Sequence, residues 1–185
     1  MSGTAKEKKG LSPNVKSVIV LTVICLIVTA LLAVTNHITE PIIKDTRAHR
    51  VAESLAKVLP NSGDYNVVAV DKDKLPSSVQ DVYYFPKDGS YAVVLATTSA
   101  YSNGDMGITV GIDSKVNIAG VALTSYMESK DFGQMTYPQQ YVGKNAAEAA
   151  KVDTVSGVTY SSKAFRKAIA DAFTAVELAK GGASQ

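Results

Sequence analysis

One carboxylate and three small polar or flexible residues stand close together ahead of the most regular helical pattern of the chain. Asp153, Ser156, Gly157 and Thr159 lie within one short stretch. Amide groups at the start of a helix, together with the helix macrodipole, form a site for a phosphate group, and Thr159 would place a hydroxyl beside that site. The same residues also suit a plain loop that leads into a capped helix, so their spacing alone leaves both interpretations open.

The segment after this stretch is predicted to be an amphipathic helix. Apolar residues recur there at spacings of three and four, which places one helical face on a core. These residues are Phe165, Ala168, Ile169, Ala172, Phe173 and Val176. Ser161 or Ser162 is predicted to cap the start of the helix, and the glycine pair at 181–182 to follow its end. Ser156 and Gly157 would let the backbone turn tightly just before it.

The pattern Asp-x-x-Ser-Gly-Val-Thr resembles the flavinylation motif of FMN-binding domains, which reads Asp-x-x-(Ser/Thr)-Gly-Ala-Thr. In that family the last threonine is joined to the phosphate of FMN by a phosphoester bond. The match falls on Asp153, Ser156, Gly157 and Thr159, and Val158 takes the place of the usual alanine. The resemblance therefore implies a covalent FMN cofactor on Thr159, attached by a separate flavin transferase.

A second motif extends the resemblance to the family of NqrC and RnfG subunits. The run from Gly107 to Val121 is similar to paired strands of that family, which then usually shows Glu-Thr-Pro-Gly-Leu-Gly. Here Glu128 and Gly133 match this pattern, while the residues at 130–131 depart from it. The resemblance covers about residues 90–175 and is greater to RnfG than to NqrC. Besides Thr159, the cofactor-binding residues that it implies are Asp153, Ser156, Gly157, Val158, Tyr160 and Glu128.

The N-terminal part of the chain is predicted to cross a membrane once. Residues 17–36 carry no charged side chain, and about twenty helical residues span a bilayer core of roughly 30 Å. The tail at 1–16 is rich in lysine, which gives a weak positive-inside bias. We therefore expect a cytoplasmic tail at 1–16, a transmembrane helix at 17–36, a helical connector at 37–63 and an extracytoplasmic FMN-binding domain at 64–185.

The connector is predicted to contain a second amphipathic helix. Pro41 marks a break or kink, after which Val51, Leu55 and Val58 fall on one side of a helix over 42–59. Within the membrane segment, Thr22, Cys25 and Thr29 lie roughly along one face that could pack against a partner helix.

Residues 65–125 change to the pattern of β-strands. Short β-prone runs occur at 67–70, 82–85, 91–96, 107–112 and 116–123, separated by turn signals such as Pro86 to Gly89. Strands followed by a helix predict an α+β domain: an antiparallel sheet with flanking helices, behind a single N-terminal transmembrane helix.

Composition excludes several kinds of chemistry for the chain alone. The net charge of +2 is too small to indicate a nucleic-acid partner. The single cysteine, Cys25, excludes an internal disulfide and a self-contained iron–sulfur cluster, and His37 and His49 are too few for a metal cluster. No Ser/His/Asp arrangement or carboxylate pair indicates hydrolysis, so no catalytic residue and no metal ligand is assigned.

The resemblance implies an electron-relay subunit of a membrane ion-translocating oxidoreductase of the Rnf type, which acts with other membrane subunits and is not self-sufficient. Two alternatives stay open: an NqrC-type subunit of a quinone reductase, and a membrane-anchored assembly module that has the fold without a working flavin. The chain has no tryptophan, so stacking on the flavin ring would fall to other side chains. The aromatic candidates are Tyr101, Tyr126, Phe132 and Tyr160.

Overall fold

The structure, a computed structural model, describes residues 13–98, 105–125 and 136–182. The chain divides into two compact units, residues 1–47 and 48–185. Helix α1 (Pro13–Val58) begins in the first unit and ends in the second.

The described part of the first unit is the N-terminal part of α1, most of which is apolar. Its large hydrophobic side chains from Val18 to Ile43 are all exposed, with between 48% and 65% of their surface accessible. A helix that exposes apolar residues all round suits a lipid environment. The threonine hydroxyls in this part donate to carbonyl groups one turn earlier, for example from Thr22 to Val18 at 2.9 Å and from Thr29 to Cys25 at 2.8 Å. Their polar atoms are thereby satisfied without water.

Pro41 lies inside α1, and the helix continues through it. Of the break or kink predicted at this position, the break is therefore wrong. Proline removes one backbone donor and crowds the preceding turn, but the long helical segments on both sides keep the chain helical. The amphipathic pattern predicted for the connector is confirmed, because Leu55 and Val58 are 1% and 2% exposed and Val51 packs beside them.

The second unit is built on a five-stranded antiparallel sheet. Its strands are β1 (Asn66–Val67), β2 (Val79–Phe85), β3 (Ser90–Thr98), β4 (Asp105–Ile112) and β5 (Ile118–Ser125). They lie in the sheet in the order of the sequence, and each pairs antiparallel with the next. The predicted α+β class with an antiparallel sheet is thus confirmed.

All five observed strands differ in extent from the predicted runs, and in β1 and β5 predicted residues fall outside the strand. β1 ends at Val67, although the Val68 amide still donates to the Val82 carbonyl at 2.8 Å. β5 begins at Ile118 rather than at Val116, because Val116 has a positive φ of 65°. It belongs to a turn that the Asp113 carboxylate closes by accepting from the Asn117 amide at 2.8 Å. β-propensity at Val116 is overridden by this turn.

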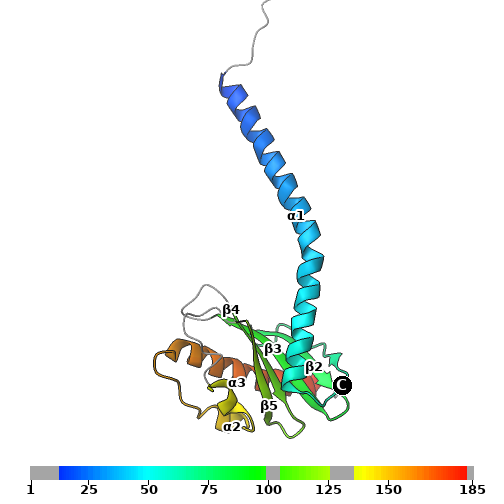
Figure 1. Cartoon of the computed structure of the whole chain (residues 1–185), viewed down its shortest axis with the longest axis vertical. Coiled ribbons are helices and arrows are strands. Elements are labelled where there is room, and N and C mark those ends of the chain that lie inside the picture. The colour runs from blue at the N-terminus through cyan, green and yellow to red at the C-terminus, as the bar shows by residue number, and fades with distance from the viewer. Residues whose placement is uncertain (1–12, 99–104, 126–135, 183–185) are drawn as a thin grey trace, which may run out of the picture. The chain divides into compact units, whose positions relative to one another are not determined.

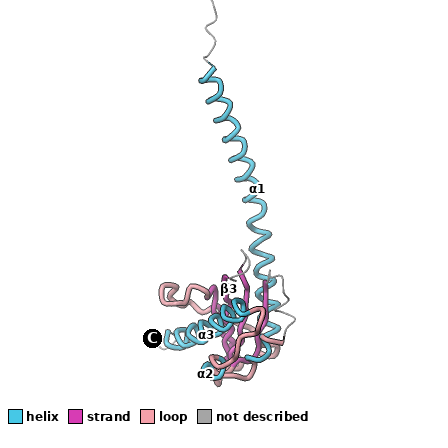
Figure 2. Tube along the Cα trace, turned by 90° about the vertical axis from the view of Figure 1, so that its left-hand side faces the viewer, coloured by secondary structure: helices cyan, strands magenta, loops and turns pink. Residues whose placement is uncertain are grey.

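One face of the sheet is covered by α3 (Thr159–Gly182), together with the 3-10 helix η1 (Pro138–Tyr141) and the short α2 (Ala146–Ala149). Figures 1 and 2 show α3 lying across the strands. The six apolar residues predicted to share a helical face are all buried, with Phe173 the most exposed at 5%. They pack against alternate residues of the central strands, including Val93, Leu95 and Val110.

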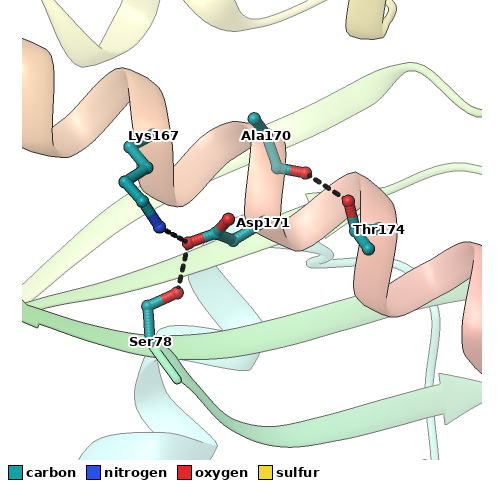
Figure 3. Close-up of polar contacts among 5 residues, drawn as sticks. All are labelled: Ser78, Lys167, Ala170, Asp171 and Thr174. Carbon is teal, nitrogen blue, oxygen red and sulfur yellow. Dashed lines mark hydrogen bonds and ion pairs between the residues drawn. The ribbon is translucent and has the colours of Figure 1, made fainter. Parts of the chain in front are cut away.

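A polar contact ties α3 to the start of β2 (Figure 3). The Ser78 hydroxyl donates to the Asp171 carboxylate at 2.6 Å, and the Lys167 ammonium lies 2.9 Å from the same oxygen. Only 15% of the Asp171 side chain is exposed, so the carboxylate is satisfied where α3 meets the sheet.

The opposite face of the sheet is covered by the last turns of α1, which belong to the second unit. Leu55, Val58 and Leu59 pack on a small apolar cluster formed by Tyr83, Phe85, Ala92 and Val94. The Thr109 hydroxyl donates to the buried Ser54 hydroxyl at 2.9 Å. The sheet is therefore sandwiched between helices, and the alternation of its side chains supplies a core on each face.

Candidate functional site

The predicted site is a tight turn that leads directly into α3. The Val158 amide donates to the Val155 carbonyl at 3.2 Å, which closes a turn with Ser156 and Gly157 at its centre. Gly157 has a φ of +84°, and the third position of a type II turn requires such a positive φ. Glycine adopts it without the strain that a Cβ would add. The positive φ that the turn requires thus explains the glycine at this position of the motif.

Helix α3 begins at Thr159, so Ser161 and Ser162 lie within its first turn. The prediction that one of them caps the helix is therefore wrong. Both side chains are buried, at 2% and 0% exposure. The turn ends one residue before Thr159, and its last carbonyl, on Val158, already accepts the Ser162 amide at 2.9 Å. At the other end, α3 includes Gly181 and Gly182 rather than stopping before them.

Thr159 places its hydroxyl on the surface at the first position of α3. The side chain is exposed, and the hydroxyl donates to the Val155 carbonyl at 3.5 Å. That distance is too long for a strong hydrogen bond between oxygens. The hydroxyl is therefore accessible and only loosely held, as a phosphate acceptor needs to be.

The other predicted residues around the motif divide into two groups. Asp153, Ser156 and Tyr160 are exposed, and Tyr160 leaves 61% of its surface accessible. Val158 is 6% exposed and belongs to the core beneath the turn. Its side chain therefore holds the turn against the core. This packing explains why a valine stands where alanine is usual.

Positive charge gathers on the first turns of α3. Lys163 follows Thr159 by four residues, which places the two on one helical face. The Arg166 guanidinium donates to the Val152 carbonyl at 3.3 Å and so also braces the loop before the turn. A cavity of about 300 Å³ lies between α2 and α3, and its lining combines apolar residues with Lys163, Arg166 and Lys167. The helix macrodipole adds to this positive potential at the start of α3.

These residues fit the phosphate of FMN. An exposed hydroxyl lies at the start of a helix, where the first amide groups have no carbonyl partner within the helix, and cationic side chains follow on the same helix. The predicted Glu128, Gly133, Tyr101, Tyr126 and Phe132 lie outside the described residues. Within the described ranges, no group of three or more His, Cys, Asp or Glu residues could hold a metal ion.

A buried aromatic cluster supports the site and was not predicted. Tyr137, Tyr141 and Phe165 pack edge to face, with ring centroids 5.3 to 5.9 Å apart. The Tyr137 and Tyr141 hydroxyls are 2.8 Å apart, and Tyr137 also donates to the Ser162 carbonyl at 3.5 Å. Burial, and then the bond to Tyr137, raises the pKa of Tyr141 far above its usual value. The spacing of four between the tyrosines was the only sequence signal for this cluster.

The chain is similar in sequence to known FMN-binding-domain proteins. Residues 11–58 match the model of the RnfG N-terminal region, and residues 102–174 match that of the FMN-binding domain. The G subunit of an ion-translocating oxidoreductase complex from Methanosarcina acetivorans is 28% identical over 183 residues, which cover 90% of this chain and 96% of that protein. The protein of the same name from Shewanella baltica is 24% identical over 187 residues, covering 87% and 88%. The chain is therefore similar to G subunits of ion-translocating oxidoreductase complexes over most of its length, and it contains a match to the FMN-binding domain.

Proposed function

We propose that the chain is an electron-relay subunit of a membrane ion-translocating oxidoreductase of the Rnf type, and that it carries FMN joined to Thr159 by a phosphoester bond. The observation that supports attachment is the exposed Thr159 hydroxyl at the start of α3, behind a turn whose glycine has the required positive φ. The names of the two relatives support the role in an oxidoreductase complex.

The cofactor would supply one- and two-electron chemistry, and the protein would supply position and electrostatics. Thr159 would hold the phosphate, the amides of the first helical turn would solvate it, and Lys163 would offset part of its charge. The exposed Tyr160 side chain is available for contact with the ring. Asp153, before the turn, and Ser156, within it, are exposed and would be recognised by the transferase.

Attachment requires an activated flavin nucleotide and a flavin transferase. Thr159 Oγ would form a bond to the FMN phosphorus as the bond from that phosphorus to the leaving phosphate of a pyrophosphate-linked flavin dinucleotide breaks. The threonine proton passes to a base of the transferase. Thr159 therefore needs an accessible hydroxyl but no base of its own, and the long bond to the Val155 carbonyl suits this role.

Replacing the threonine tests the attachment site. The Thr159→Ala protein, co-expressed with a flavin transferase, should lose the mass of FMN and its in-gel fluorescence after denaturation, while the domain stays folded. Thr174→Ala is a matched control, because Thr174 is an exposed threonine of the same helix whose hydroxyl also bonds a carbonyl one turn earlier, at 3.2 Å. Flavin retained after denaturation in Thr159→Ala would place the attachment elsewhere.

The membrane arrangement that we propose has α1 crossing once, the tail at 1–16 in the cytoplasm and the flavin domain outside it. The exposed apolar surface of α1 supports the crossing, and the lysine-rich tail supports the direction. Protease added to right-side-out vesicles should digest the domain. Digestion only after the membrane is permeabilised would place the domain in the cytoplasm.

A tethered flavin cannot diffuse to its electron donor, so partner subunits have to lie beside it. We expect purification in mild detergent to retain other membrane subunits of an Rnf-type set. The face of Thr22, Cys25 and Thr29 on α1 offers one contact for them. Rapid turnover of a soluble donor and acceptor by the isolated, flavin-loaded subunit would instead indicate a self-sufficient enzyme. A wild-type protein without covalent flavin would favour an assembly module, and co-purification with quinone-reductase subunits would favour an NqrC-type role.

A further inference from the structure

The hydroxyl of Ser162 joins the two sides of the turn before α3. It donates to the Val158 carbonyl at 2.9 Å and accepts from the Val155 amide at 3.3 Å. The first bond is common for a serine inside a helix. The second reaches seven residues back, out of the helix and into the loop. Because the Ser162 side chain is 0% exposed, water cannot easily replace either bond.

The residue that Ser162 holds is also the one that contacts Thr159. The Val155 amide is bound by Ser162, while the Val155 carbonyl accepts from the Val158 amide at 3.2 Å and from the Thr159 hydroxyl at 3.5 Å. The turn that leads to Thr159 therefore depends on Val155. Ser162 reaches Thr159 through this one residue.

Ser162 lies against the buried aromatic cluster of Tyr137, Tyr141 and Phe165. Its carbonyl accepts from the Tyr137 hydroxyl at 3.5 Å, and Tyr137 is held by the hydroxyl of Tyr141 and by the ring of Phe165. All three aromatic residues are at most 1% exposed. The Ser162 backbone thus lies at a buried contact, and from there its side chain bonds the loop at Val155.

We propose that Ser162 is a positioning residue for flavin attachment, which acts by holding Val155 so that the turn presents the Thr159 hydroxyl to the transferase. This inference rests on the proposed attachment of FMN to Thr159. A displaced acceptor hydroxyl lowers the rate of the transfer step, and misplacement by about 1 Å can cost about a hundredfold. Ser162 acts through its bond to Val155, so its contribution is to geometry.

Three substitutions at Ser162 separate the effect of its hydroxyl from the effect of the volume of its side chain. Ser162→Ala removes both bonds, Ser162→Cys keeps a side chain of similar shape with much weaker hydrogen bonding, and Ser162→Thr retains the hydroxyl. The full-length proteins in detergent are incubated with purified flavin transferase and flavin dinucleotide, and intact mass follows the initial rate of FMN incorporation. We expect Ser162→Ala and Ser162→Cys to slow incorporation by about ten- to a hundredfold, and Ser162→Thr to recover most of it.

Ser54→Ala controls for loss of stability. Ser54 is also a buried serine with two hydrogen bonds, to the Val51 carbonyl at 2.8 Å and to the Thr109 hydroxyl at 2.9 Å, but it lies on the opposite face of the sheet. Incorporation is measured well below the melting temperature of each protein. Hydrogen exchange of the Val155 amide gives a second readout, which should accelerate in Ser162→Ala and Ser162→Cys but not in Ser54→Ala.

The outcomes distinguish the inference from the function on which it rests. Wild-type incorporation with an unchanged rate in both Ser162→Ala and Ser162→Cys would overturn the positioning role and leave attachment intact. An equal slowing in Ser54→Ala would also overturn it, because stability alone would then explain the loss. Absence of FMN from the wild-type protein would overturn attachment at Thr159, and with it the positioning role.

Discussion

Gly120 of β5 lies directly against the backbone of Val58 in the last turn of α1. A Cβ at Gly120 would lie 2.7 Å from the Val58 carbonyl oxygen and 2.9 Å from its Cα. Gly111, the cross-strand partner of Gly120, would place a Cβ 3.0 Å from the same oxygen. The two glycines thus let the end of α1 approach the sheet closely, where side chains would hold it away.

The Gly120→Ala protein should be less stable than the wild type by about 1–3 kcal/mol, because backbone atoms cannot move aside as a flexible side chain can. Urea unfolding of the full chain in detergent, followed by circular dichroism, measures the change. Gly181→Ala serves as the control, since nothing lies within 4 Å of a Cβ there and Gly181 is helical. It should leave stability unchanged or raise it by up to about 1 kcal/mol. Equal effects of the two substitutions would contradict the close approach.

Gly157→Ala should lower both stability and FMN incorporation. The φ of +84° is unfavourable for alanine, at a cost of about 1–2 kcal/mol, and relief of that strain would distort the turn before Thr159. Gly143→Ala is a matched control, because Gly143 has a φ of +81° and open space around it but belongs to another loop. It should lower the melting temperature similarly and leave covalent flavin unchanged. Mass spectrometry and a thermal melt report the two effects separately.

Lys163→Glu should slow FMN incorporation at low salt. The flavin donor is an anion, and reversal of a charge one turn beyond Thr159 weakens its attraction to the start of α3. The difference from wild type should shrink as salt rises, since exposed charges are screened. Lys115→Glu, in the turn between β4 and β5, makes the same change in net charge and should have little effect. Equal slowing by both would point to net charge rather than to the site.

Alkaline pH should destabilise the domain through Tyr141. Burial and the bond to Tyr137 raise its pKa in the folded state, whereas a tyrosine in the unfolded chain ionises near pH 10. The folded state therefore keeps a proton that the unfolded state loses, so stability is complete below about pH 10 and falls above it. Tyr141→Phe should weaken this fall, at a loss of about 1 kcal/mol near pH 7 for the missing hydrogen bond. Urea unfolding at pH 7 to 11 would show it; parallel pH profiles for both proteins would exclude Tyr141 as the cause.

The amino-acid sequence alone determined the elements whose formation depends only on residues close to one another in the chain. The uncharged run at 17–36 was enough to predict an apolar helix, because length and composition alone decide whether a segment can span a bilayer. The buried face of α3 followed from the spacing of Phe165, Ile169 and Phe173, which core packing then satisfied. The tight turn at Gly157 was also readable, since Gly157 and Thr159 serve a turn and a helix start that involve only their neighbours.

The tertiary structure decided what depends on contacts between distant residues. Sequence suggested a cap at Ser161 or Ser162, but the turn that closes at Val158 moved the helix start and left both hydroxyls buried. The buried aromatic cluster beside Ser162 joins η1 to α3, and no local sequence pattern predicts that contact. The backbone contact between Gly120 and Val58 likewise exists only because a helix and a strand about sixty residues apart share one face of the sheet. Periodicity reports which side of an element is buried, whereas only packing decides which neighbour buries it.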